Sequence, residues 1–131
     1  MMKRFALFQD DVDCEIFPAG TIIFETGNPG DRMYIIQEGE VDILIGAQVL
    51  ETVGSDNLIG EMALIDTQIR SATAVTKSDC KLIPINKRRF TFLVQQHPYF
   101  ALQVMQVLAD RLRRMNAKGI NIQLPSAIEV N

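Results

Sequence analysis

Side chains that bind metals or form disulfides are scarce in this sequence of 131 residues. It contains two cysteines, Cys14 and Cys80, and one histidine, His97. Two thiols are too few for a four-thiolate iron–sulfur site or for the disulfide framework of a small secreted domain. A single histidine also disfavours a metal centre built on imidazoles. We therefore expect no metal site, no cofactor and no catalytic function, and we interpret both cysteines as small buried hydrophobes.

Long apolar runs and an excess of positive charge are also missing. No stretch approaches the roughly 18 apolar residues of a membrane-spanning helix, and the first ten residues, MMKRFALFQD, lack the long apolar region of a signal peptide. Thirteen basic and sixteen acidic side chains give a net charge of −3, which disfavours a general affinity for nucleic acid or anionic membrane. The sequence thus predicts a cytoplasmic protein with no membrane association.

A series of short β-rich runs fills the first two thirds of the chain. The length fits one domain, and 47% hydrophobic and 22% charged residues are ordinary values for a globular protein. Seven runs are separated by turn signals that include glycine and proline: CEIF, TIIFE, MYIIQE, VDILI, QVLETV, ATAVT and CKLIPI. Such runs, spaced about ten residues apart, are typical of an antiparallel sandwich or a small barrel. In VDILI, Val41, Ile43 and Ile45 alternate and are predicted to share one face.

The apolar spacing then changes to that of helices. Asn86 is a suitable N-cap for a helix over 87–96. A break is expected at His97, because the residue before a proline avoids helical backbone. Pro98 suits the first position of a second helix that reaches about Lys118 and is closed by glycine.

The second predicted helix carries an apolar stripe and a basic end. The stripe must pack against another part of the fold or against a partner, and its members are Ala101, Val104, Met105, Leu108, Leu112 and Met115. The basic residues are Arg111, Arg113, Arg114 and Lys118. Cations are favoured at the carboxyl end of a helix by its macrodipole, and a patch for nucleic acid or a partner is the alternative.

Two opposite charges stand out in the stretch GEMALIDTQIRSAT, residues 60–73. Glu61 and Arg70 lie in a mostly apolar segment, and a charge that leaves water needs a partner. Gly60 permits a tight turn, after which one helical turn is predicted, with free N–H groups that attract an anion. An arginine could complete a phosphate site, and a carboxylate beside it suits a ligand that also carries hydroxyl groups. The alternative is an internal Glu61–Arg70 salt bridge.

The same stretch resembles the phosphate-binding cassette of the cyclic-nucleotide-binding domain family. The family pattern is approximately G-E-hydrophobic-A-L, a short gap, and then R-S/T/A-A-S/T. The matching residues are Gly60, Glu61, Met62, Ala63, Leu64, Arg70, Ser71, Ala72 and Thr73. Upstream, FPAGTIIFETGNPGDRMYIIQEGEVDI resembles the family's opening strands, and RRFTFLVQQHPYFALQVMQVLADRLRR resembles its B and C helices. The resemblance covers roughly residues 5–116.

The resemblance implies a mainly β fold. This fold is a double-stranded β-helix or jelly roll, an eight-stranded antiparallel β-roll flanked by an N-terminal helix and by C-terminal B and C helices. We expect a single domain over residues 1–131, with a core at about 5–118 and a tail at 119–131.

The resemblance also assigns roles to residues of the cassette. Glu61 and the backbone of Gly60 would bind the ribose 2′-hydroxyl, and Arg70 would bind the cyclic phosphate. The amides of Ala63 and Ser71 would assist Arg70. Three further residues complete the predicted site: Ile59 and Met62 as pocket walls, and Asn116 as a contact to the base. Met115 departs from the polar pattern of the bacterial catabolite-activator branch.

The implied function is regulatory. We expect cyclic AMP rather than cyclic GMP on the likeness to bacterial members, although Ser71 excludes neither ligand. The ligand would shift the B and C helices and so signal to an unidentified protein partner or a second copy. The C helix either forms a homodimer, with Val104, Leu108, Leu112 and Met115 as candidates, or caps its own β-roll. Since the sequence is too short for a helix-turn-helix after the C helix, we expect no DNA binding by this chain alone. The alternatives are the sensor fragment of a larger transcription regulator and a ligand-free interaction module with a relic pocket.

Overall fold

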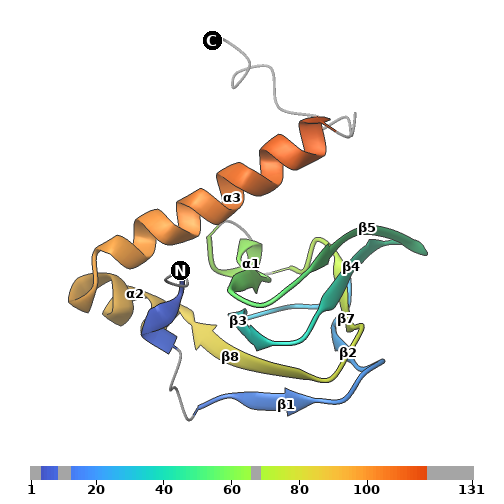
Figure 1. The fold of residues 1–131 in the computed structure, drawn as a ribbon, viewed down its shortest axis with the longest axis horizontal. Coiled ribbons are helices and arrows are strands. Elements are labelled where there is room, and N and C mark those ends of the chain that lie inside the picture. Colours follow the sequence, from blue (N-terminus) through green and yellow to red (C-terminus); the bar gives the residue numbers. More distant parts are fainter. Residues whose placement is uncertain (1–3, 9–12, 66–68, 118–131) are drawn as a thin grey trace.

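Two four-stranded antiparallel sheets face each other in a computed structural model, which describes residues 4–8, 13–65 and 69–117 (Figure 1). The first sheet has the order β1–β8–β3–β6 and comprises Glu15–Phe17, Cys80–Asn86, Arg32–Glu38 and Asn57–Ile59. The second has the order β2–β7–β4–β5 and comprises Ile22–Phe24, Thr73–Thr76, Val41–Ile45 and Gln48–Val53. The expected eight-stranded antiparallel β-roll is confirmed.

Strand β6 is not among the seven runs identified in the sequence. It has only three residues, and its first, Asn57, was placed in a turn. It pairs with β3, where Ile59 lies opposite Tyr34. Its two apolar residues, Leu58 and Ile59, are both fully buried, on opposite faces. A strand of three residues is too short to show an alternating pattern in the sequence. It is recognised only by its pairing with β3.

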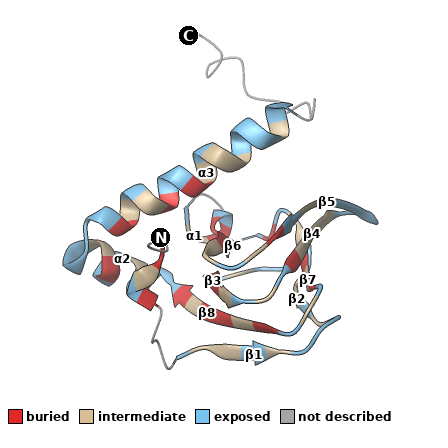
Figure 2. Ribbon diagram, viewed as in Figure 1, coloured by how far each residue is buried: buried red, intermediate tan, exposed pale blue. Residues whose placement is uncertain are grey.

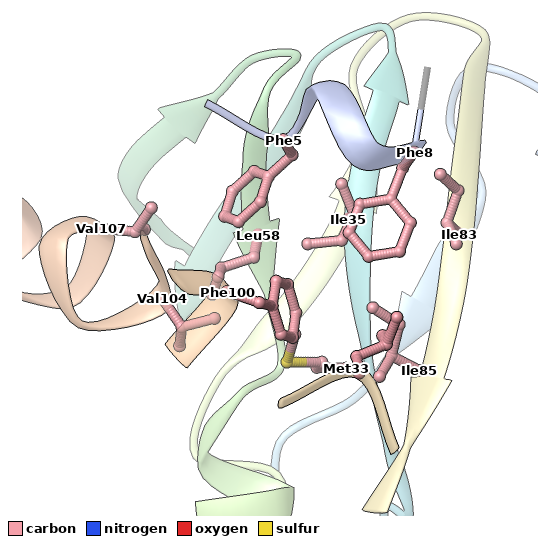
Figure 3. Packing of buried hydrophobic residues seen from close by; sticks show 11 residues of the cluster. Phe5, Phe8, Met33, Ile35, Leu58, Ile83, Ile85, Phe100, Val104 and Val107 are labelled. Atoms are coloured by element: carbon pink, nitrogen blue, oxygen red, sulfur yellow. The ribbon is translucent and has the colours of Figure 1, made fainter. Parts of the chain in front are cut away.

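The middle of the first sheet is buried on both faces, which explains the nearly continuous apolar runs of β3 and β8. In β3, Met33 and Ile35 face the helices, whereas Tyr34 and Ile36 face the second sheet. Successive side chains of a strand point to opposite faces, so the run MYII serves two separate cores. Figure 2 shows the resulting burial along β8, and Figure 3 shows the helix-side core, which includes Phe8 and residues of the C-terminal helix.

Four helical segments complete the fold: η1 (Ala6–Phe8), α1 (Met62–Ile65), α2 (Lys87–Gln96) and α3 (Tyr99–Ala117). The Asn86 side chain accepts a hydrogen bond of 2.8 Å from the Arg89 amide, which confirms the predicted N-cap. The break at His97 is also confirmed. The expected N-terminal helix is a three-residue 3-10 turn within the described residues. The predicted closing glycine, Gly119, and the tail lie outside them.

Helix α3 packs against the core with only part of the stripe that its sequence suggested, including Val104 and Leu108. Its buried residues are Phe100, Val104 and Val107. Met105 and Leu112, which were predicted to share the packed stripe, are 58% and 48% exposed. Because apolar residues occur on most sides of this helix, their spacing alone does not determine which side packs.

Candidate functional site

A cavity of about 320 Å³ lies between the β-roll and the second half of α3. Seven of the eight residues predicted to bind a ligand line it: Ile59, Gly60, Glu61, Met62, Ala63, Arg70 and Ser71. The eighth, Asn116, is exposed and is not among the lining residues, whereas its neighbour Met115 is. The sequence motif therefore converges on one cavity, and Asn116 lies apart from it.

The backbone at Gly60 turns sharply between β6 and α1. Gly60 has a φ of +77°, a conformation that glycine adopts without strain. The short helical turn predicted here is present: the amide of Leu64 donates to the carbonyl oxygen of Glu61 at 3.0 Å, and the amide of Ala63 to that of Gly60 at 3.3 Å. The turn places the Glu61 side chain at the cavity wall.

Arg70 is a buried cation without a carboxylate partner. Only 6% of the residue is exposed, and Arg70 forms no ion pair with any of the residues that the structure describes. One guanidinium nitrogen, Nη1, donates to the Gly60 carbonyl at 3.1 Å, and the guanidinium carbon lies 4.2 Å from the centre of the Phe24 ring. Its Nε has no hydrogen-bond partner. Burial lowers the pKa of Arg70, which is the expected effect of removing a charge from water.

Two glycines leave room for this guanidinium. A Cβ added at Gly60 would lie 2.7 Å from Arg70 Nη1, and one added at Gly30 would overlap Arg70 Nε. Neither Gly30 nor the aromatic ring of Phe24 was assigned to the site from the sequence. Both are far from the cassette along the chain, so no local pattern connects them with Arg70.

Glu61 forms its ion pair with Arg111 of α3, not with Arg70. Arg111 Nη1 donates to Glu61 Oε1 at 2.7 Å, and Nη2 donates to the carbonyl oxygen of Leu58 at 2.6 Å. The side chains of Glu61 and Arg111 are only 8% and 15% exposed. The internal Glu61–Arg70 salt bridge considered from the sequence is therefore not formed. Assigning Arg111 to the helix macrodipole was incomplete, because its partner lies 50 positions away in the sequence.

The other arginines of the basic end also have acidic partners. Arg114 donates to Glu51 Oε1 through Nε at 2.9 Å and through Nη2 at 2.5 Å. Glu51 Oε2 lies 3.5 Å from Arg111 Nε, and Arg113 pairs with Asp110. Lys118 lies outside the described residues. These arginines are thus engaged within the fold, which weakens the alternative of a free basic patch.

The lining of this mainly apolar cavity holds a guanidinium, Arg70, and a carboxylate, Glu61, that do not pair with each other. Such a site suits a small anion that also donates a hydrogen bond. Among residues 4–8, 13–65 and 69–117, no group of three or more histidine, cysteine or acidic side chains could hold a metal ion. None of the helices in that part of the chain is long and apolar enough to cross a membrane.

Residues 14–97 match the family model described as "Cyclic nucleotide-binding domain". Over 105 residues, the chain is 32% identical to a CRP-like cAMP-activated global transcriptional regulator of Mycobacterium tuberculosis, which covers 76% of this chain and 47% of that protein. Over 103 residues, it is 33% identical to the cyclic AMP receptor protein of Thermus thermophilus, covering 75% of this chain and 48% of that protein.

Similarity to a solved structure extends over most of the fold. The catabolite activator protein of Thermus thermophilus matches with a TM-score of 0.72 and 28% identity, over 90% of this chain and 58% of that one. The matched region spans about half the length of the Mycobacterium tuberculosis and Thermus thermophilus relatives described above.

Proposed function

The chain belongs to the cyclic nucleotide-binding domain family, and we propose that it is a regulatory module that binds a 3′,5′-cyclic nucleotide, with cyclic AMP as the first candidate. One observation carries this proposal. The buried guanidinium of Arg70 has an unpartnered Nε and no carboxylate partner among the described residues. It lines a cavity whose two carboxylates, Glu61 and Glu51, are paired with arginines of α3. A cyclic phosphate would supply the missing anion.

The cavity walls support a division of roles. Arg70 and the amides of Ala63 and Ser71 would hold the phosphate, and Glu61 with the Gly60 backbone would accept the ribose hydroxyl. Paired with Arg111, the Glu61 carboxylate still has capacity to accept a hydrogen bond, because an ionised carboxylate offers about four lone-pair sites. Arg111 also offsets the negative charge that would otherwise repel a phosphate.

Calorimetric titration with cyclic AMP and cyclic GMP tests this proposal. Binding is expected for the unaltered chain and should be strongly weakened in Arg70→Ala and Glu61→Ala. Arg113→Ala is the matched control, since its side chain is 71% exposed and does not line the cavity. Equal heats for all four proteins would favour the alternative, a ligand-free interaction module with a relic pocket.

The buried charges favour a working site over a relic. A buried arginine without an ion pair weakens a fold, and an apolar residue of similar volume would be more stable there. Since Arg70 is buried here without a counter-ion, beside two glycines that leave room for it, a ligand explains its presence better than folding does.

Helix α3 is the proposed output element. Its first half packs in the helix-side core through Phe100, Val104 and Val107. Arg111 in its second half lines the cavity and pairs with Glu61. A ligand that binds Glu61 would therefore change the ion pair that holds this half of α3 against the β-roll. We propose that the signal passes to a further domain or protein, that the chain is not itself catalytic, and that it does not bind DNA alone.

A second copy is one proposed recipient of the signal. The exposed face of α3 carries a stripe at alternating spacings of three and four, formed by Leu102, Met105, Ala109, Leu112 and Asn116. This is the heptad spacing of a coiled-coil seam, with a polar Asn at one position. Of the residues suggested from the sequence, Val104 is buried in the core, and Leu108, Leu112 and Met115 line the cavity, although Leu112 is also 48% exposed. Sedimentation should show a dimer that Met105→Glu disrupts and that Gln95→Glu, on the exposed surface of α2, does not.

A further inference from the structure

The lining of the cavity changes character from one part to another. Around Arg70 it is polar, with Glu61, Ser71 and the backbone of Gly60. The walls contributed by β4, its hairpin with β5, and α3 are mainly apolar. Their apolar residues are Ile43, Ile45, Leu50, Leu108, Leu112 and Met115. A nucleotide whose phosphate is at Arg70 would therefore place its base mostly against side chains that neither donate nor accept hydrogen bonds.

Two charged residues also line this region, but other contacts engage them. Arg111 donates to Glu61 and to the Leu58 carbonyl, and Glu51 accepts two hydrogen bonds from Arg114. The remaining nitrogen of Arg111, Nε, is buried and lies 3.5 Å from Glu51 Oε2. A base could bond to either side chain only by displacing one of these ion-paired contacts.

We propose that this cavity selects the cyclic ribose phosphate and not the hydrogen-bonding edge of the base. The inference rests on the proposed function and concerns its specificity. A site that hydrogen-bonds a ligand group discriminates strongly against analogues lacking it, because its own polar groups are then left unpaired. An apolar wall has no such groups, so removing a polar substituent from the base costs no interaction. Any preference for adenine over guanine then reflects the greater number of polar groups that guanine must desolvate.

Competition binding with three ligands tests this inference: cyclic AMP, cyclic GMP, and the cyclic monophosphate of purine riboside, which is cyclic AMP without the 6-amino group. The purine analogue should bind within about threefold of cyclic AMP, or more tightly, and cyclic GMP should be weaker by about tenfold at most. A loss of more than about tenfold on removal of the amino group would overturn the inference, since that is the effect of a lost hydrogen bond with its partner left unsatisfied.

Variants separate this specificity from overall affinity. Leu50→Ala should weaken all three ligands by similar factors, because Leu50 lines the cavity with an apolar side chain and is not part of the stripe on α3. Ser71→Ala and Asn116→Ala should leave the affinity ratios unchanged. Ser71 is the exposed hydroxyl at the polar end that could reach the guanine amino group, and Asn116 lies outside the cavity lining. A change of more than about tenfold in a ratio for either variant would overturn the inference by identifying a reader of the base.

The two proposals fail in different ways. If none of the three nucleotides binds, the proposed function is wrong. If all bind through Arg70 but their affinities depend steeply on the base, only the inference on specificity is wrong.

Discussion

Arg70 and Arg111 are two arginines of the same cavity: Arg70 is buried in the β-roll wall, and Arg111, with 15% of its side chain exposed, is carried by α3. Arg111 is neutralised by Glu61 and lies within 3.5 Å of Glu51, and it also donates to a backbone carbonyl. Arg70 has only the Gly60 carbonyl and the face of Phe24. Arginine thus has two roles in this cavity. Arg111 holds α3 against the β-roll through an ion pair, whereas the charge of Arg70 has no counter-ion.

This difference separates a structural cation from one suited to a ligand. A buried ion pair is costly to break, because removing one partner leaves the other charge unpaired. A buried cation without a counter-ion is itself destabilising, and its loss can be neutral for the fold. Substituting Arg111 should therefore mainly lower the stability of the fold, and substituting Arg70 should mainly lower the affinity for the ligand.

Arg70→Met should produce the largest loss of affinity with little loss of stability. Charge-assisted hydrogen bonds to a phosphate contribute about 1.5–3 kcal/mol each, so a loss of at least roughly 100-fold in affinity for cyclic AMP is expected. The free energy of unfolding in urea should stay within about 1 kcal/mol of the original value or rise. Arg113→Met is the control for both quantities. A destabilisation above about 2 kcal/mol would show that Arg70 supports the fold and would remove the contrast.

Arg111→Met, unlike Arg70→Met, should mainly reduce the stability of the fold. It leaves the Glu61 carboxylate buried and unpaired, and a loss of about 2–3 kcal/mol in the free energy of unfolding is expected. Because Glu61→Gln removes the same pair, the double variant should be less destabilised than the two single losses added together. Urea denaturation of the four proteins in this cycle gives the coupling energy. Simple additivity would mean that the observed 2.7 Å contact contributes nothing to stability.

The two walls also differ in how many of their lining residues could be predicted from the sequence. The β-roll wall comes from one contiguous stretch, and residues 59–63 with Arg70 and Ser71 all line the cavity as predicted. These residues were assigned from the resemblance to the family's cassette, and the positive φ of Gly60 fixes the local turn that brings them together. Their binding roles stay predictions.

The α3 wall could not be deduced in the same way. Arg111 and Glu51 are joined to the site by contacts between distant segments, and no local pattern pairs them. The rotation of α3 was equally hidden, since apolar residues lie on most sides of it and only packing shows that Val107 faces inward. Asn116, which was placed at the ligand by counting along the helix, lies on the exposed side for the same reason.

A pair of glycines sharpens the contrast within the β-roll wall. Gly60 and Gly20 have nearly equal φ angles of +77° and +83°, but a Cβ at Gly60 meets Arg70 whereas one at Gly20 meets nothing within 4 Å. Gly60→Ala and Gly20→Ala should each cost about 1–2 kcal/mol in stability, through the left-handed backbone. Only Gly60→Ala should also weaken ligand binding, by about tenfold, because displacing Arg70 misplaces its charged hydrogen bonds. Equal affinities for the two variants would show that the position of Arg70 does not depend on the space at Gly60.

Glu51→Gln should have the smallest effect, and a local one. The buried residues of α3 end at Val107, and beyond that point Arg111 and Arg114 connect the helix to β5 and β6 through Glu51, Glu61 and the Leu58 carbonyl. Glu51→Gln removes the carboxylate charge, but its amide oxygen can still accept from Arg114, which is 44% exposed, and Arg111 keeps its pair with Glu61, so the cost should be about 0.5 kcal/mol. Amide hydrogen exchange should therefore rise by about two- to threefold over residues 108–117 only, and the difference should shrink in 1 M salt. Glu38→Gln, which breaks an exposed pair with Lys81 on the first sheet, should leave α3 unchanged. Faster exchange along the whole of α3 would mean that the ionic half and the apolar half are not separable, and that a ligand at Glu61 acts on the helix as one rigid unit.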